Sequence, residues 1–388
     1  MEGLVINQNR SLQSNMAPLF HDVFRHRRVL VTGHTGFKGA WLCEWLLNLG
    51  AEVHGYALDP LPHAVFFDQL RLHKRLVTDH RADILDRQCL ATVTRDLAPD
   101  FVFHLAAQPI VRLSYQQPVE TFAVNVMGTI HMLDALRLSG QPCTAVMVTT
   151  DKCYENREWL HPYREEDPMG GHDPYSASKG AAEIAIAAWR RSFSHALNAP
   201  VRIASARAGN VIGGGDWAPD RIVPDAIRAV FAGEPVSVRN PHATRPWQHV
   251  LEPLSGYLKL AAAIYAKSQS LPVAGTPPLA DLCGGFNFGP TVCSNQPVGT
   301  LVAALLSYTG GSWQSISDPV APHEAAKLHL ATEKAFHLLG WRPIWSFEDT
   351  VRMTASWYTQ LSAGADPGEL TRSQIVDFVN TPKTAHLT

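Results

Sequence analysis

The chain alternates short apolar runs with longer segments of helical character. Short, largely apolar segments, which suit strands buried on both faces, occupy 27–33, 51–58, 75–79, 100–105, 145–148 and 201–206. Segments of helical character lie at 40–49, 118–139 and 175–188. Because strand and helix repeat in this order, the pattern predicts an α/β fold built on a doubly wound parallel sheet.

After residue 206 this alternation stops. A glycine-rich loop covers 207–217, and a helix entered through 220–224 is expected to end at Phe231. Further helices are expected at 252–266, 298–309, 328–339, 347–361 and 370–379, and a strand at 286–289 is expected to return to the sheet. The second half therefore has the character of a smaller α/β unit beside the sheet.

The first apolar run leads directly into Gly33, Gly36 and Gly39 and then into the first helix. Strand, glycine-rich turn and helix in this order are typical of a dinucleotide-binding βαβ unit, in which the helix N-terminus faces the phosphates. The spacing is GxxGxxG instead of GxGxxG, and three glycines alone do not identify such a unit. A P-loop is disfavoured, because Lys38 precedes Gly39 and no GK[ST] sequence follows.

Two carboxylates are candidates for the adenosine end of such a ligand. Asp59 lies 20 positions after Gly39, where it would accept the ribose hydroxyls and favour NAD over NADP. A solvated turn acid before Pro60 is an equally good interpretation. Asp83 is a candidate for the adenine amino group, and Asn125, in an apolar surround, is either a ligand contact or a satisfied core amide.

The segment 145–188 carries the strongest candidate chemistry. Its strand ends in four residues placed where open α/β sheets bind their ligands, namely Thr149, Thr150, Asp151 and Lys152. Tyr175 and Lys179 share one face of the following helix, so the ammonium can stabilise a phenolate. A phenol of pKa ~10 would then act as a base closer to neutrality. A tyrosine and a lysine on a solvated helix face are the alternative.

Three arginines lie in segments with little regular structure, namely Arg221, Arg239 and Arg245, flanked by Trp217 and Trp247. Arginine forks suit a diphosphate, and aromatic faces suit a base. Scattered surface arginines are the alternative interpretation.

Composition narrows the classes of function. The chain has 33 basic and 35 acidic residues, so it lacks the basic field of nucleic-acid binders. Six cysteines include no CxxC pair and no Cys/His ligand spacing, which argues against a metal site and a disulfide framework and favours the cytoplasm. No apolar run approaches ~18 residues and the N-terminus lacks a signal-peptide pattern, so we expect no membrane partner.

Longer strings of residues resemble the extended short-chain dehydrogenase/reductase superfamily and, within it, the family of CDP-glucose 4,6-dehydratases. The resemblance covers about residues 27–361. It is carried by TDKCYEN at 150–156, YRE at 163–165, DPMGG at 167–171, DPYSASK at 173–179, ARAGNVIGGGDW at 206–217, RNP at 239–241 and RPWQHVLEPLSG at 245–256.

The resemblance implies a lyase that converts CDP-glucose to CDP-4-keto-6-deoxyglucose and water, with NAD as a recycled prosthetic group. Tyr175, assisted by Lys179, would take the proton of the sugar 4-hydroxyl, and Thr150 would hydrogen-bond the 4-oxygen. Asp151 would be the acid that releases water. Lys152 stands where most sugar-nucleotide dehydratases place a glutamate base. A lysine abstracts a proton only when neutral, against a reference pKa of ~10.4, so burial beside Lys179 and a positive nicotinamide ring would have to favour the neutral form.

The resemblance also implies two sets of binding residues. The cofactor set comprises Gly33, Thr35, Gly36, Phe37, Lys38, Gly39, Asp59, Asp83, Ile84, Leu105, Ala106, Ala107, Gln108, Asn125, Thr149, Tyr175 and Lys179. The nucleotide-sugar set comprises Asn210, Arg221, Arg239, Arg245 and His249. We expect an NAD-binding Rossmann domain at 27–206, with segments returning at 250–267 and 285–289, a nucleotide-sugar-binding domain at 207–249 and 290–388, and an N-terminal extension at 1–26.

Other functions stay open. A nucleotide-sugar 4-epimerase needs the same Thr, Tyr, Lys and NAD, but no acid and base for elimination, so Asp151 and Lys152 favour a dehydratase. A dehydratase for another nucleotide-hexose differs only in base recognition. A non-catalytic NAD-sensing protein would be expected to lose the reactive residues, all of which are present. Pairing through sheet-layer helices is common in the superfamily, so 118–139 and 175–193 predict a homodimer or higher homo-oligomer. A lipopolysaccharide or antibiotic pathway is usual for the family.

Overall fold

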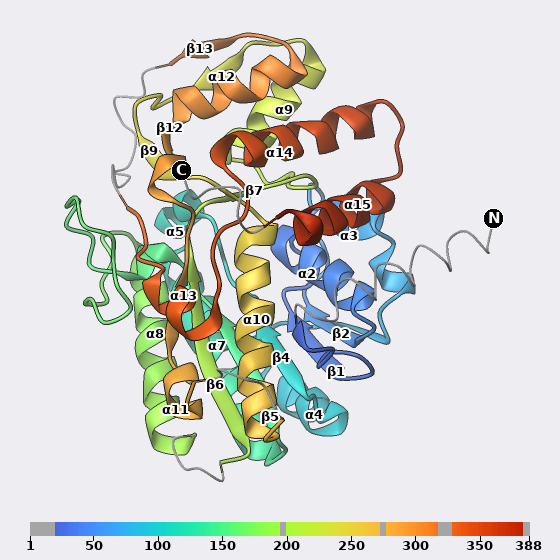
Figure 1. Ribbon diagram of the computed structural model, residues 1–388, viewed down its shortest axis with the longest axis vertical. Helices are drawn as coiled ribbons and strands as arrows, with labels where there is room; N and C mark the ends of the chain where they lie inside the picture. The colour runs from blue at the N-terminus through green and yellow to red at the C-terminus, as the bar shows by residue number, and fades with distance from the viewer. Residues whose placement is uncertain (1–19, 195–198, 272–276, 317–327, 383–388) are drawn as a thin grey trace.

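A computed structural model describes residues 20–194, 199–271, 277–316 and 328–382. At its centre is a seven-stranded sheet with the order β11-β6-β5-β4-β1-β2-β3, in which every neighbouring pair is parallel (Figure 1). Its strands are β1 (Arg28–Thr32), β2 (Glu52–Ala57), β3 (Thr78–Arg81), β4 (Phe101–His104), β5 (Cys143–Val148), β6 (Val201–Ala208) and β11 (Gly285–Phe288). The predicted doubly wound parallel sheet is confirmed, and the predicted returning strand forms its edge beside β6.

Each face of the sheet has its own hydrophobic core, because successive side chains of a strand point to opposite faces. In β5, Val146 and Val148 enter one core, whereas Ala145 and Met147 enter the other. Helices α2 (Phe37–Asn48) and α10 (Leu251–Ser268) supply side chains to the first core. Helices α4 (Arg87–Leu97), α7 (Gly128–Ser139) and α8 (Pro174–Phe193) supply the second. This double burial explains the continuous hydrophobicity of the strands.

Short helices and single turns connect the longer elements. They are α3 (Phe66–Gln69), α5 (Val111–Gln116), α6 (Pro118–Phe122), α11 (Leu279–Leu282) and the single turns η1 (Leu72–Lys74), η3 (Asp151–Cys153) and η4 (Val292–Ser294). Among the described residues, no helix is both long and apolar enough to cross a membrane.

The segments after β6 build a second region above the carboxyl ends of the strands (Figure 1). Its helices are α9 (Ile222–Ala232), α12 (Val298–Thr309), α14 (Phe347–Ser362) and α15 (Pro367–Asn380). The short helix α13 (Glu333–Leu339) lies beside α10 and β11 of the sheet layer instead (Figure 1). Three two-stranded pairings accompany the helices of the second region: β7 (Val211–Ile212) with β10 (Gln248–His249), β9 (Thr244–Pro246) with β12 (Asn295–Pro297), and β8 (Val236–Val238) with β13 (Trp313–Ser315). The core of this region is continuous with the core beneath α2 and α10. The assignment of two separate binding domains stays a prediction.

Several sequence-based boundaries differ from the structure, and the helix expected at 328–339 begins only at Glu333. The helix expected at 118–139 is broken into α6, a π-helical segment η2 (Ala123–Met127) and α7. The strand expected at 75–79 lies at Thr78–Arg81.

The predicted extension is also too long. Phe20 and Phe24 are buried, and their rings pack on Trp45 and Phe101, so the folded body includes residues 20–26. Residues 1–19 of the predicted extension lie outside the described residues.

Candidate active site

A cavity of about 840 Å³ lies at the carboxyl ends of the central strands, between the sheet and the second region. It is lined by the glycine-rich turn, by the end of β5, by the first turns of α8, and by loops that precede α9 and follow β8. The predicted site residues that line it are Gly33, Thr35, Gly36, Phe37, Lys38, Gly39, Asp59, Asp83, Ile84, Leu105, Ala106, Ala107, Thr149, Thr150, Asp151, Lys152, Tyr175, Lys179, Asn210, Arg221, Arg239 and Arg245. Gln108, Asn125 and His249 do not line it.

The glycines of the first turn are required by close packing. Gly33 has φ +73°, and a Cβ there would lie 2.7 Å from the backbone nitrogen of Ala106. A Cβ on Gly39 would lie 2.2 Å from the carbonyl oxygen of Gly33. The first turn of α2 carries no acidic side chain, so its N–H groups and helix dipole form an anion site at the cavity wall. The turn therefore fits the diphosphate of a dinucleotide.

The adenosine end of this site is open. The Asp59 side chain is 86% exposed at the mouth of the cavity, 3.9 Å from the guanidinium of Arg81. Asp83 uses Oδ1 to accept the N–H of Leu85 and uses its carbonyl to accept the hydroxyl of Tyr56. Asp59 is thus accessible to a ribose, whereas Asp83 is partly engaged in holding its own loop.

Asn125 lies behind the cavity wall and hydrogen-bonds to two of the segments that form it. Its Oδ1 accepts the N–H of Gln108 at 2.9 Å, and its Nδ2 donates to the hydroxyl of Ser178 at 2.9 Å. Ser178 donates in turn to the carbonyl of Tyr175. Asn125 and Gln108 therefore lie outside the cavity lining, and their contact with the cofactor stays a prediction. Their amides join the loop after β4 to α8, which is the core-amide alternative.

Thr150 and Asp151 form the polar end of β5. The Thr150 hydroxyl donates to Oδ1 of Asp151 at 2.9 Å, while Oδ2 is buried without a hydrogen-bond partner in the described structure. Burial raises the pKa of Asp151, despite opposing effects of Lys152, Thr150 and Arg245. Asp151 is thereby suited to keep a proton at the cavity wall. Lys152 lines the same wall and is half-buried, and its role as a base stays a prediction.

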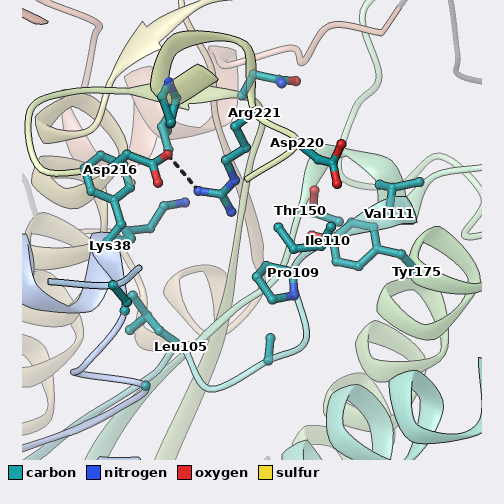
Figure 2. A pocket seen from close by; sticks show the side chains of 18 of the residues that line it. Lys38, Leu105, Pro109, Ile110, Val111, Thr150, Tyr175, Asp216, Asp220 and Arg221 are labelled. Atoms are coloured by element: carbon teal, nitrogen blue, oxygen red, sulfur yellow. Dashed lines mark hydrogen bonds and ion pairs between the residues drawn. The ribbon is translucent and has the colours of Figure 1, made fainter. Parts of the chain in front are cut away.

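Tyr175 and Lys179 both reach the cavity from the first turns of α8, as their spacing predicts. Asp173 caps this helix by accepting the N–H of Ser176. Figure 2 shows the Tyr175 ring beside Thr150. Burial raises the pKa of Tyr175 to about 12, and hydrogen bonding to Thr150 and the charge of Arg221 oppose this effect. The expectation of a lowered Tyr175 pKa is therefore wrong for the protein alone, because desolvation outweighs the nearby cations.

A buried ion pair between Glu183 and Arg207 supports the cavity wall formed by the end of β5 and the first turns of α8, and no motif indicated it. Glu183, one turn after Lys179, accepts hydrogen bonds from Thr149, Ser205 and Arg207. Burial lowers the pKa of Lys179 to about 8, although the Glu183 charge opposes this. The i, i+4 spacing of Lys179 and Glu183 places Glu183 near this wall, but it does not predict Arg207 as its partner.

The arginines on the opposite wall are paired with carboxylates that sequence reasoning missed. Arg221 donates to Oδ2 of Asp216 at 2.9 Å (Figure 2), and Arg239 donates to Oδ1 of Asp220 at 3.0 Å. Arg245 is buried in β9 and donates to the carbonyl of Thr244. All three arginines line the cavity, and the charges of Arg221 and Arg245 act on the pKa values of Tyr175 and Asp151, respectively.

His249 is not part of this wall. Its side chain is fully buried, with its ring against Trp41 and Trp345, and burial lowers its pKa to about 3. The prediction that His249 binds substrate is therefore wrong in this structure: the ring fills the core beneath the cavity. Of the two tryptophans singled out, Trp247 lines the cavity and Trp217 packs on Tyr358 instead.

Comparisons with known proteins agree with this architecture. The model of the GDP-mannose 4,6-dehydratase family matches residues 30–272. CDP-glucose 4,6-dehydratase of Salmonella typhimurium is 44% identical over 91% of this chain and 96% of its own. Among solved structures, the dTDP-glucose 4,6-dehydratase of Streptomyces venezuelae aligns with a TM-score of 0.71 at 23% identity, over 88% of this chain and 99% of its own. UDP-glucose 4-epimerase of Thermotoga maritima aligns with a TM-score of 0.71 at 21% identity, over 87% of this chain and 99% of its own. The chain therefore belongs to the GDP-mannose 4,6-dehydratase family of nucleotide-sugar enzymes.

Proposed function

We propose that this chain is an NAD-dependent CDP-glucose 4,6-dehydratase, a hydro-lyase that forms CDP-4-keto-6-deoxyglucose. The relative with 44% identity carries this activity in its name, and a structural neighbour of the same fold was solved with NAD. The glycine-rich turn, the accessible Asp59 and the anion site of α2 fit this cofactor. When bound, NAD accepts a hydride from C4 of the sugar and returns it to C6, so that no net redox change occurs.

The protein's part in the first half-reaction is to move the proton of the 4-hydroxyl. Tyr175 would accept this proton while Thr150 holds the 4-oxygen, since both side chains line the cavity side by side. A phenol whose pKa is about 12 releases its proton more readily when positive charge gathers around it. Arg221 already supplies such charge, and Lys179 lies one turn further along the same helix face.

The protein's part in the second half-reaction is elimination of water across C5 and C6. The 4-ketone makes the C5 proton acidic, and Lys152 would remove it. Asp151 would protonate the leaving 6-hydroxyl. The observation that carries the proposal is the buried Asp151, whose pKa is raised and whose Oδ2 has no hydrogen-bond partner among the described residues, because an epimerase has no use for a protonated acid at this position.

The direct test is to incubate the purified chain with CDP-glucose and catalytic NAD and to weigh the product by mass spectrometry. A product lighter by one water supports the dehydratase. An isomer of unchanged mass would favour the 4-epimerase, and an unchanged substrate would favour a binding protein.

We also propose a homodimer acting in the cytoplasm, in deoxysugar biosynthesis of the kind that serves lipopolysaccharide. Apolar side chains are exposed on the helices expected to pair: Val119 is 75% and Ile184 is 62% exposed. Burying them against a second copy would remove apolar surface from water. Light scattering on the intact chain, compared with a Val119→Asp variant, tests the dimer; equal masses for both at the dimer value would contradict this interface.

A further inference from the structure

Lys38 occupies an unusual position on the cavity wall. It is the second residue of α2, next to the glycine-rich turn, and its side chain crosses to α10. There its Nζ lies 3.5 Å from the hydroxyl of Tyr257 and 5.7 Å from the centre of that ring. Figure 2 shows the side chain extended toward the pair of Arg221 and Asp216 on the opposite wall. Lys38 thus reaches from the cofactor half of the cavity to the substrate half.

The charges around Lys38 are mostly of its own sign. Burial lowers its pKa to about 8, and the nearby charges of Arg221 and Lys179 act in the same direction, whereas Asp151 opposes them. Lys38 forms no ion pair within the part of the chain that the structure describes. A half-buried ammonium among other cations is unfavourable by itself, so this arrangement suits a site that receives anions.

Two anionic groups would enter this cavity from opposite sides. The N-terminus of α2 is an anion site on one side of Lys38, and Arg221 lies on the other. Both expected ligands carry a diphosphate, and two diphosphates in one cavity of low dielectric repel each other. A cation between them weakens this repulsion.

We propose that Lys38 bridges the diphosphate of the dinucleotide and the diphosphate of the nucleotide sugar, and so couples the binding of the two ligands. This inference rests on the proposed function. It extends the role of Lys38 from a cofactor contact to the residue that makes each ligand bind more tightly in the presence of the other. Coupling of this kind is reciprocal, so each ligand changes the affinity of the other by the same factor.

The test is a double titration by calorimetry on protein freed of nucleotide, with NAD and CDP as probes. CDP affinity is measured with and without saturating NAD, and NAD affinity with and without saturating CDP. The variants are Lys38→Met, which keeps the length of the side chain, and Lys38→Arg, which keeps the charge. Lys74→Met is the matched control, because Lys74 is exposed on η1 and does not line the cavity.

In the native chain and in Lys74→Met, we expect saturating NAD to tighten CDP binding, on the order of tenfold. In Lys38→Met this factor should fall to near one in both directions, and Lys38→Arg should retain most of it. The melting temperature of Lys38→Met should not fall, because a desolvated cation is removed; a clear fall would indicate a structural role and would contradict the inference.

Unchanged coupling in Lys38→Met, or weaker NAD binding with unchanged coupling, would overturn the bridging role while leaving the proposed function intact. A native chain that binds neither NAD nor CDP would overturn the proposed function itself, and the bridging role with it.

Discussion

Thr150 donates a 2.9 Å hydrogen bond to one oxygen of Asp151 and leaves the other oxygen, which is buried, without a partner in the described structure. The carboxyl is therefore held in a fixed orientation by its sequence neighbour. Because burial raises its pKa, Asp151 keeps its proton at a higher pH than an ordinary aspartate does. An acid of this kind is what release of water from C6 requires.

Replacement of Asp151 by Asn should stop the reaction after C4 oxidation. The 4-keto-hexose and the reduced cofactor should accumulate, and dehydration should slow by ~10²–10⁴-fold, the usual contribution of a positioned acid. Single-turnover absorbance of the reduced nicotinamide, with product analysis, measures both. Asp96→Asn is the control, since its side chain is 63% exposed on α4. Normal turnover of Asp151→Asn would contradict the assignment.

The pH dependence of the same variant has a defined sign. A carboxyl whose pKa is raised on folding stabilises the fold below its unfolded pKa of 3.8 and loses that contribution as pH rises through the folded value. Asp151→Asn should therefore melt at a higher temperature than the native chain at neutral pH. The native dehydration rate should fall as pH rises through the raised pKa of Asp151, because the acid form is lost.

Replacement of Lys152 by Met should also stop the reaction after C4 oxidation, but before the C5 proton is removed. If Lys152 removes the C5 proton, the variant should form the 4-keto-hexose and then stall, with no exchange of the C5 proton for deuterium. In Asp151→Asn, by contrast, exchange at C5 should continue. NMR of the sugar in deuterated water distinguishes the two variants. Full turnover of Lys152→Met would remove this residue from the mechanism.

Replacement of Arg245 by Ala should weaken substrate binding more than it slows catalysis. A charge-assisted hydrogen bond contributes ~1.5–3 kcal/mol, which corresponds to a KM increase on the order of 10- to 100-fold. Steady-state kinetics with varied CDP-glucose give KM and kcat separately, and Arg95→Ala, exposed on α4, is the control. An unchanged KM would refute contact between Arg245 and the diphosphate.

The buried ion pair of Glu183 and Arg207 should dominate the stability of the cavity wall formed by β5 and α8. Glu183→Ala leaves Arg207 buried without its 2.8 Å partner, so the free energy of unfolding should fall by ~3–5 kcal/mol in urea titrations. Burial alone would raise the pKa of Glu183, but Arg207 and its hydrogen bonds lower it below 4.5. The pair's contribution is therefore present above pH 4.5 and is lost as pH falls through the folded pKa. Asp96→Ala, which removes an exposed pair, should change stability by under ~1 kcal/mol; a similar loss in both variants would contradict this account.

The sequence pattern alone was sufficient to predict the strands, the shared helix face of Tyr175 and Lys179, and the glycine-rich turn. The strands are recognisable because both faces are buried, and Tyr175 and Lys179 share the cavity because a helix places residues four apart on one side. The glycine-rich turn was predictable because the backbone packs too closely around Gly33 and Gly39 to admit a Cβ, so only glycine fits at these positions.

Residues placed by tertiary packing were not predictable in this way. His249 lies in a characteristic string, yet its orientation depends on Trp41 and Trp345, which are distant in sequence. Asp216 and Asp220 reach the arginines through loop conformations, including φ +60° at Asp220, that no periodicity encodes. Burial, which only the fold determines, reversed the expected direction of the Tyr175 pKa.

The most direct test of the central claim is incubation of the purified chain and catalytic NAD with CDP-, GDP-, dTDP- and UDP-hexoses in deuterated water, with products identified by mass spectrometry and NMR. We expect CDP-glucose alone to lose water, with one deuterium at C5, because C5 is deprotonated and then reprotonated from solvent during elimination and hydride return. An isomer of unchanged mass, or dehydration of another nucleotide-hexose in preference to CDP-glucose, would contradict the account.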